Sequence, residues 1–311
     1  MRITRQLEDL RLDTRPVVLA VGYFDGVHRG HQAVIGEAVS KAAAMRGEAW
    51  VLTLDPHPLK ILKPQAAPPL ITSTPHKIAL MEPLGVDGCV VLPFTRELAA
   101  EEPEDFVARL HRAAPNLKEL VVGQNWTFGH KGRGTADLLR KLAPDNDLQV
   151  SVVEPLLWKK DVISSTRIRR SVAKGDLEDA EQMLGRPFSV LGTVVRGRHI
   201  GTQLGFPTAN LDPHNEVRPP SGVYAVYAKV HGRRWPGAAF LADITDAKGS
   251  PSGFIVEVHI LGFDMDVYGE DIEVSFVRHV RDVQHFNGRE ALRQQIARDV
   301  QAVGDMLPPV D

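Results

Sequence analysis

The pattern of apolar residues changes after residues 184–187 (LGRP), and this change limits what the chain can fold into. Before it, short apolar runs alternate with stretches of helical spacing, which predicts a parallel sheet covered by helices. The proline-rich residues 63–75 predict a loop. The apolar runs are 16–21, 48–54, 86–92, 120–122 and 150–153, and the predicted helices include 30–45, 103–112 and 135–142.

Beyond this point, β-branched and aromatic runs are separated by Gly, Pro and Asp, which predicts an antiparallel β-barrel or a sandwich. Residues 287–303 have apolar side chains at helical spacing and predict an amphipathic closing helix. Because 311 residues exceed the size at which one core usually suffices, we expect two domains, 1–186 and 187–311. The strands of the second domain are expected at 188–195, 222–230, 253–261 and 272–280.

Composition excludes several classes of protein. The 37 basic and 39 acidic residues nearly balance, which argues against a general nucleic-acid or anionic-membrane binder. The one cysteine, Cys89, allows neither an intrachain disulfide nor a cysteine-based zinc site. The first 15 residues have no apolar signal core, and no apolar stretch reaches the ~20 residues of a membrane span. We therefore expect a cytoplasmic protein, and a homo-oligomer stays open.

A His-x-Gly-His tetrad follows the first apolar run. Gly22 and Gly26 supply a turn, and the predicted helix begins near Gly30. Because a helix N-terminus stabilises phosphate oxygens, we expect His28 and His31 to donate hydrogen bonds to a nucleoside triphosphate there. The alternative is that the two histidines are a polar surface feature.

A second motif, Ile-Ser-Ser-Thr-Arg-Ile-Arg, begins another predicted helix. The hydroxyls of Ser165 and Thr166 are expected to donate to phosphates, and Arg169, with Arg167 nearby, is expected to neutralise departing pyrophosphate. An ordinary helix cap with surface arginines is the alternative.

Two more motifs follow predicted strands. Asp55 and His57 belong to an Asp-Pro-His-Pro sequence, and Asn125 lies in a segment with Trp126 and Phe128. These positions are expected at the carboxyl edge of the sheet. A proline-shaped turn and core aromatics are the respective alternatives.

Together, these four motifs resemble the bacterial bifunctional riboflavin kinase/FMN adenylyltransferase (FAD synthetase) family. The resemblance rests on FDGVHRGH, DPHP, VGQNWTFG and ISSTRIR, in the family's order. It implies a Rossmann-like nucleotidyltransferase domain that transfers AMP from ATP to FMN, giving FAD and pyrophosphate. It also implies that Phe24 and Asp25 belong to the nucleotide-binding segment. Tyr23 and Leu54 stand where many relatives have Asn and Phe.

The second half resembles the kinase domain of the same family. After Gly205 and Phe206, the sequence Pro207-Thr208-Ala209-Asn210 predicts a turn with hydroxyl and amide ligands suited to a hard cation. Glu257 lies in an alternating strand pattern, where a carboxylate can accept a hydroxyl proton. The resemblance implies that Thr208 and Asn210 hold Mg²⁺ and ATP phosphates, and that Glu257 activates riboflavin for phosphorylation to FMN. A structural turn and an exposed strand residue are the alternatives.

Two segments depart from the family. Residues 197–203 have fewer basic side chains than relatives, and residues 237–246 replace a conserved flavin-side stretch, with Phe240 where an Asn is expected. Three hypotheses follow. The chain makes FMN and then FAD; it is an FMN adenylyltransferase whose kinase-like domain is inactive or takes a modified flavin; or it is a non-catalytic flavin or nucleotide sensor. Both enzymatic hypotheses require Mg²⁺ with ATP, and their substrates are ATP, FMN and riboflavin.

Overall fold

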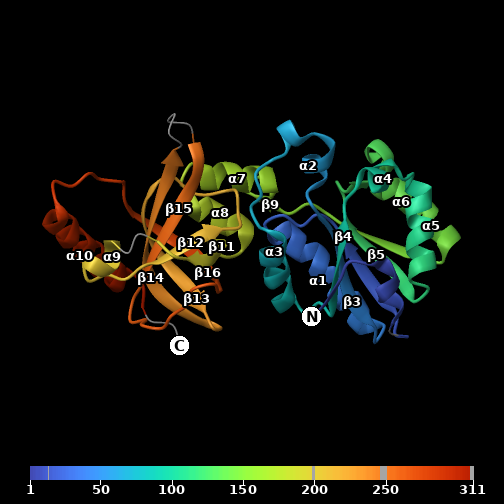
Figure 1. Cartoon of the computed structure of the whole chain (residues 1–311). Helices are drawn as coiled ribbons and strands as arrows, with labels where there is room; N and C mark the ends of the chain where they lie inside the picture. The colour runs from blue at the N-terminus through green and yellow to red at the C-terminus, as the bar shows by residue number, and fades with distance from the viewer. Residues whose placement is uncertain (13, 198–199, 246–250, 309–311) are drawn as a thin grey trace. The chain divides into compact units, whose positions relative to one another are not determined.

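A computed structural model describes residues 1–12, 14–197, 200–245 and 251–308. The chain divides into two compact units, which are described separately (Figure 1). Unit 1 comprises Met1–Pro68 and Thr74–Ser165, and unit 2 comprises Pro69–Ser73 and Thr166–Asp311. The expected functional boundary at residue 186 stays a prediction.

Unit 1 is built on a six-stranded parallel sheet with helices on both faces, as the apolar runs predict. The strand order β1-β4-β3-β2-β5-β8 reverses direction of growth at β2, so the carboxyl ends of β2 and β5 form a topological switch point. The strands are β1 (Arg2–Thr4), β2 (Val17–Val21), β3 (Glu48–Asp55), β4 (Gly88–Pro93), β5 (Leu117–Gly123) and β8 (Gln149–Val153).

Both faces of the sheet are buried, because alternate residues of each strand belong to different apolar clusters. On β2, Leu19 packs in one cluster and Ala20 in the other. Helices α1 (Arg29–Ala44) and α3 (Thr74–Met81) supply the Ala20 side, while α5 (Pro103–Ala113) and α6 (Ala136–Leu142) supply the Leu19 side. The remaining short elements include α2 (Pro58–Leu62), α4 (Arg96–Ala100), β6 (Thr127–Phe128), β7 (Gly134–Thr135), β9 (Leu157–Trp158) and β10 (Asp161–Val162).

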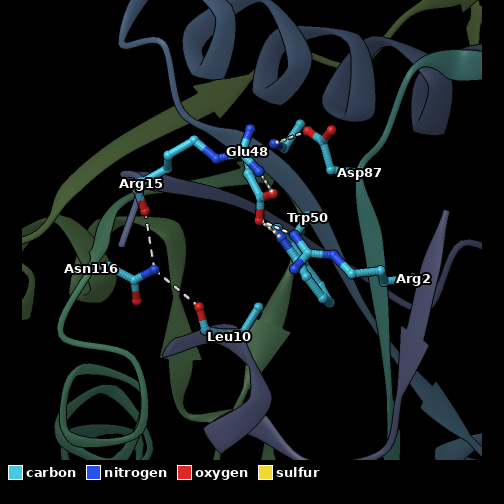
Figure 2. Close-up of polar contacts among 8 residues, drawn as sticks. Arg2, Leu10, Arg15, Glu48, Trp50, Asp87 and Asn116 are labelled. Atoms are coloured by element: carbon cyan, nitrogen blue, oxygen red, sulfur yellow. Dashed lines mark hydrogen bonds and ion pairs between the residues drawn. The ribbon is translucent and has the colours of Figure 1, made fainter. Parts of the chain in front are cut away.

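A polar cluster fixes the amino end of β3 (Figure 2). The Glu48 side chain is 2% exposed and accepts hydrogen bonds from Arg2, Arg15 and the indole nitrogen of Trp50, the last at 2.9 Å. Asn116 donates to the carbonyls of Leu10 and Arg15. The cluster therefore ties β1 and the segment before β2 to the sheet, at the edge opposite the strands' carboxyl ends.

Unit 2 is a closed six-stranded antiparallel barrel, which decides between the two architectures that the sequence left open. Strand β12 begins at Ala209, inside the segment expected to be a turn, so that expectation was wrong from Ala209 onward. The barrel strands are β11 (Phe188–Val195), β12 (Ala209–Pro213), β13 (Gly222–Val230), β14 (Arg233–Thr245), β15 (Pro251–Ile260) and β16 (Asp271–Arg281).

Helices α7 (Ser165–Ala173) and α8 (Leu177–Leu184) precede the barrel, α9 (Ile200–Gln203) lies between its first two strands, and α10 (Arg289–Met306) follows it. The closing helix is confirmed, and its Val303 packs on Ala225 of β13. The expected loop at 63–75 was wrong at its end, because α3 begins at Thr74. None of the described helices is long and apolar enough to cross a membrane.

Candidate functional site

The turn between β2 and α1 has a strained backbone that several elements hold. Phe24 and Val27 have φ angles of 58° and 41°, values that are rare for residues other than glycine. Such conformations persist where surrounding contacts fix them. The Tyr23 carbonyl accepts a hydrogen bond from Thr53 Oγ1 at 2.9 Å, and the Val27 carbonyl accepts one from Gln32 Nε2 at 2.8 Å. These hydrogen bonds hold the backbone of the turn in one conformation.

Gly22 is required at the start of this turn because the Phe24 ring lies against it. A Cβ atom at Gly22 would lie 2.8 Å from the ring of Phe24, which is closer than real contacts allow. The Phe24 ring is 2% exposed and packs edge-on against His31, with 5.3 Å between ring centroids. Gly22 and Phe24 therefore act on the site by setting the position of His31.

The two histidines of the tetrad lie together at the start of α1. Their rings stack with 3.5 Å between centroids and an angle of 19°. His28 is the N-cap residue, and its Nδ1 atom accepts a hydrogen bond from the backbone N–H of His31 at 3.3 Å. A neutral His28 therefore carries its proton on Nε2, which makes Nε2 a donor.

His31 is held in its neutral form. Burial lowers its pKa well below 6.5, and the positive charges of His28 and Lys77 lower it further. Its Nδ1 atom is buried and has no hydrogen-bond partner among the described residues. A neutral imidazole can still donate one hydrogen bond to a phosphate oxygen without a change of charge.

Two cavities of 240 Å³ each adjoin in unit 1, and both are lined by Val21, Gly22 and Trp126. The first contains His28, His31 and Asn125 at the carboxyl ends of β2, β5 and β8. The second is apolar, with Phe106 and Phe128 in its wall. Because Trp126 stacks on Phe128 at 4.6 Å between centroids, this wall offers flat aromatic surface beside a polar chamber.

Asp55 and His57 lie at the carboxyl end of β3, but neither is among the described residues that line these two cavities. Asp55 accepts a hydrogen bond from Thr74 Oγ1 at 2.9 Å. The His57 Nδ1 atom caps α2 by accepting from the Leu59 N–H, and its ring packs on Tyr23 at 4.4 Å. These contacts support the turn and α2, and the expected substrate contacts of Asp55 and His57 stay predictions.

The second motif begins α7, and the boundary between the two units falls in its first turn. Ser165 Oγ donates to the Asp25 carbonyl at 3.0 Å, so this hydroxyl fastens the turn before His28. Asp25 itself is 3% exposed. In unit 2, Arg169 Nε donates to the Pro69 carbonyl at 2.7 Å. Thr166 and Arg167 also belong to unit 2, and the expected phosphate contacts of all three residues stay predictions.

Sequence reasoning missed Lys77 on α3. Its side chain is 1% exposed, and its ammonium group donates to the Tyr23 carbonyl and to Thr53 Oγ1, both at 2.9 Å. Lys77 lies four residues before the buried Met81, on the face of α3 that packs against the sheet. A charged residue at a core-facing position of a helix is the signal that could have found it.

The barrel of unit 2 also holds two adjoining cavities, of 380 and 310 Å³, and Thr208 lines both. Pro207 lines the first cavity, and Glu257 lines the second together with Phe240. Gly205, with a φ of 87°, provides the left-handed turn that leads to Thr208. The structure therefore brings the expected Thr208 and Glu257 to the wall of one chamber.

Asn210 lies on β12 directly opposite Glu257 of β15. A Cβ atom at Gly197 would lie 2.3 Å from the amide nitrogen of Asn210, so only glycine leaves room for that side chain. The amide is thus held beside the carboxylate strand position. Arg198 and His199 of the expected phosphate loop lie outside the described residues.

The unusual 237–246 segment forms most of β14, apart from Asp246, which lies outside the described residues. Phe240 pairs in register with Glu257, so its ring and the carboxylate line the same chamber. The far wall includes Arg281 and Asp299, which form a bidentate ion pair with Arg281 Nη2 2.7 Å from Asp299 Oδ2. The chamber is therefore mainly apolar. Its charged side chains are the Arg281–Asp299 ion pair and the carboxylate of Glu257.

Comparison with known proteins places both units. A family model for FAD synthetase matches residues 10–167, and one for riboflavin kinase matches residues 184–307. A crystal structure described as a macrolide-efflux protein from Streptococcus pneumoniae is similar over 96% of both chains, with a TM-score of 0.79 and 29% sequence identity.

Proteins with similar sequences are named as bifunctional enzymes with both activities. The bifunctional riboflavin kinase/FMN adenylyltransferase of Listeria monocytogenes is 37% identical over 91% of this chain and 90% of the relative. That of Pseudomonas fluorescens is 32% identical over 99% of each chain. With both domains matched over nearly their full length, the chain belongs to the bifunctional riboflavin kinase/FMN adenylyltransferase family.

Proposed function

We propose that this chain phosphorylates riboflavin to FMN in its barrel and adenylylates FMN to FAD at its histidine pair. One observation carries the proposal: each unit holds two adjoining cavities, with the expected reactive side chains in their walls. Two chambers that share a wall suit a nucleotide on one side and a flavin on the other.

For adenylyl transfer, an FMN phosphate oxygen attacks the α-phosphorus of ATP. A new P–O bond forms, the bond to the β-phosphate oxygen breaks, and pyrophosphate leaves. His28 and His31 donate hydrogen bonds to the phosphate oxygens, where charge accumulates in the transition state. The flavin ring lies against Trp126, which offers an aromatic face between the two chambers.

Other expected groups of unit 1 support the histidine pair. Gly22, Phe24, Asp25 and Gly26 shape the turn below the phosphates. Asn125 lines the polar chamber and offers an amide to the nucleotide or flavin. The phosphate contacts expected of Ser165, Thr166, Arg167 and Arg169, and the substrate contacts expected of Asp55 and His57, stay predictions.

For phosphorylation, the terminal hydroxyl of riboflavin attacks the γ-phosphorus of ATP. Glu257 accepts the hydroxyl proton, a new P–O bond forms, and ADP leaves. Thr208 belongs to both chambers and is placed to contact ATP phosphates at the wall that separates nucleotide from flavin. Gly205 and Pro207 shape this wall.

Mg²⁺ fits the oxygen-rich side chains of the kinase site. The described residues contain no cluster of three His, Cys, Asp or Glu that could hold a metal by themselves. The Thr208 hydroxyl and the Asn210 amide oxygen are hard ligands of the kind that Mg²⁺ takes when substrate phosphates and water fill its other positions. When bound, Mg²⁺ neutralises charge on the ATP phosphates in both reactions.

A second candidate function is FMN adenylylation alone. Phe240 favours it, because this bulky ring lines the same chamber as Glu257. One assay separates the candidates: purified protein receives ATP and Mg²⁺ with either riboflavin or FMN, and products are resolved by chromatography. The bifunctional proposal predicts FMN and FAD from riboflavin. FAD from FMN, with no product from riboflavin, would support the second candidate, and FAD from neither would refute both. The cytoplasmic location and self-association stay predictions.

A further inference from the structure

A buried lysine contacts the turn that carries the histidine pair. Lys77 lies on α3, and its ammonium group is 2.9 Å from both the Tyr23 carbonyl oxygen and Thr53 Oγ1. Thr53 Oγ1 in turn donates to the same Tyr23 carbonyl at 2.9 Å. Three polar groups from α3, β3 and the turn therefore form one closed triangle.

The same ammonium group also fixes the Tyr23 side chain. It lies 4.2 Å from the centroid of the Tyr23 ring, within the range of a cation–π interaction. That ring packs edge-on against His57, the N-cap of α2, at 4.4 Å. Lys77 thus links α3 to the backbone and the side chain of Tyr23, and through the ring to the Asp-Pro-His-Pro segment.

Keeping a cation at this position is costly. Burial lowers the pKa of Lys77 to about 8, against the opposing influence of Asp25, Cys89 and Asp55. Its ammonium group donates hydrogen bonds to a carbonyl and a hydroxyl, and desolvating an ammonium group is unfavourable. A methionine or leucine would fill the same space without this cost. We therefore expect the charge of Lys77 to have a role other than packing.

That role follows from the turn. Phe24 and Val27 adopt left-handed φ angles directly after Tyr23, and His28 follows them. A strained turn keeps its conformation only while its anchors hold. Thr53 and Lys77 both anchor its first carbonyl, that of Tyr23, so loss of either lets the segment before His28 relax.

We propose that Lys77 is a positioning residue for adenylyl transfer, which holds the Tyr23–His28 turn so that His28 and His31 face the ATP phosphates. The proposal rests on the proposed function of the histidine pair. Misplacing groups that act on the transition state by about 1 Å can cost ~100-fold in rate. The loss should therefore appear in kcat more than in KM.

The experiment uses the full chain with Lys77→Met, Thr53→Val and the double variant. Lys41→Met is the matched control, because Lys41 also bonds to a sheet residue, Glu119 at 2.8 Å, but does not contact the turn. Steady-state FAD formation from FMN and ATP gives kcat and both KM values. FMN formation from riboflavin, if the parent shows it, and thermal unfolding report on folding. His28→Ala is measured in parallel.

We expect Lys77→Met to lower kcat for FAD formation by about 10- to 100-fold, with both KM values within about 3-fold. Thr53→Val should lower kcat in the same direction, and the double variant should lose no more than Lys77→Met, because both act through one carbonyl. Lys41→Met should match the parent. If Lys77→Met fails to fold, the kcat and KM values of Thr53→Val test whether the anchor of the Tyr23 carbonyl positions the histidine pair.

Two results overturn the inference while sparing the proposed function. In the first, His28→Ala loses FAD formation while the folded Lys77 and Thr53 variants keep kcat within 2-fold of the parent. In the second, those variants change only KM. By contrast, normal FAD formation by His28→Ala would remove the proposed function of the histidine pair and the inference with it.

Discussion

The two sites handle ATP with different side chains, and the difference follows from their nucleophiles. In unit 1, the proposed nucleophile is an FMN phosphate oxygen, which is an anion at neutral pH. In the barrel, the proposed nucleophile is a hydroxyl, which must lose a proton. The unit 1 cavity presents two imidazoles, one of them held neutral, whereas the barrel chamber presents the carboxylate of Glu257.

In the proposed mechanisms, a general base acts only at the site whose nucleophile must lose a proton. A donor pair suffices when the attacking group is already charged. Glu154 also lines the cavity of the histidine pair, but a phosphate oxygen that is already an anion has no proton for it to accept. The two carboxylates that the motifs single out, Asp25 and Asp55, do not line this cavity. Asp25 is 3% exposed, and Asp55 accepts a hydrogen bond from Thr74 away from the cavities. The predictions below test this division of labour.

The largest effect is expected at the base. Glu257→Gln keeps the shape of the side chain but cannot accept the hydroxyl proton, so FMN formation from riboflavin should fall by about 10²- to 10⁴-fold. FAD formation from FMN should stay unchanged. Product chromatography measures both. Glu270→Gln, which changes an exposed ion pair with His231, is the matched control. Equal FMN output from Glu257→Gln and the parent would remove Glu257 as the base.

The reverse pattern is expected at the donors. His28→Ala or His31→Ala should lower FAD formation from FMN by about 10²- to 10³-fold, because each removes a donor to the transition state. FMN formation should be unaffected. His111→Ala on α5 is the control for loss of a histidine in unit 1. A parallel fall of both activities would point to misfolding and contradict the division between the sites.

A smaller effect is expected at the flavin wall of the barrel. Phe240→Ala should raise KM for riboflavin by about 10-fold, because the variant loses one aromatic contact with the flavin. The kcat value should change little, because Glu257 stays in place. Initial rates over a range of riboflavin concentrations give both constants. A lower KM in the variant would mean that Phe240 obstructs riboflavin, which would favour the adenylyltransferase-only function.

The neutral state of His31 predicts a dependence of stability on pH. Its folded pKa lies well below the unfolded value of 6.5, so protonation favours the unfolded chain. The contribution of this group is present above pH 6.5 and is lost as pH falls toward the lowered pKa. Tryptophan fluorescence melts mainly report unit 1, which holds Trp50, Trp126 and Trp158. The melting temperature of His31→Gln should therefore fall less than that of the parent as pH is lowered from 7.5. Equal falls in the two proteins would contradict the prediction.

The smallest effect on activity is expected at the opposite edge of the sheet. Glu48→Gln weakens the contacts with Arg2 and Arg15 but keeps an acceptor for Trp50, so stability should fall by about 1–3 kcal/mol. Denaturant unfolding measures this loss. Both activities should stay within 2-fold of the parent under native conditions. A selective loss of FAD formation would show that this edge communicates with the histidine pair.

Much of the fold could be predicted from the sequence, because its signals are local. The apolar runs match strands of the parallel sheet, and the four runs after residue 187 match barrel strands. Strand β12 was missed because its residues, Ala209–Pro213, resemble a turn, and pairing on both sides with β11 and β15 overrides that preference. Strand spacing alone could not tell the barrel from a sandwich, because closure depends on pairing between β11 and β16, far apart in sequence. The resemblance to the kinase domain implied a barrel, and the structure confirms it.

The site was predictable in its motifs but not in its supports. His28, His31, Thr208 and Glu257 stood out because their residue types suit phosphate chemistry. Lys77 did not, because its partners are a backbone carbonyl and a hydroxyl that only the folded sheet brings to it. A motif marks what faces a ligand, whereas the groups that fix its position come from distant segments.

The polar cluster at Glu48 has a practical consequence for anyone who isolates the adenylyltransferase half. The FAD synthetase family model begins at residue 10, yet Arg2 bonds to Glu48 and β1 pairs with β4. A fragment that begins at residue 10 would lose the Arg2 cation beside the buried Glu48 carboxylate. It would also expose the edge of β4, and an exposed strand edge promotes aggregation. A fragment that keeps the first nine residues avoids both defects, since this domain is physically longer than its sequence signature.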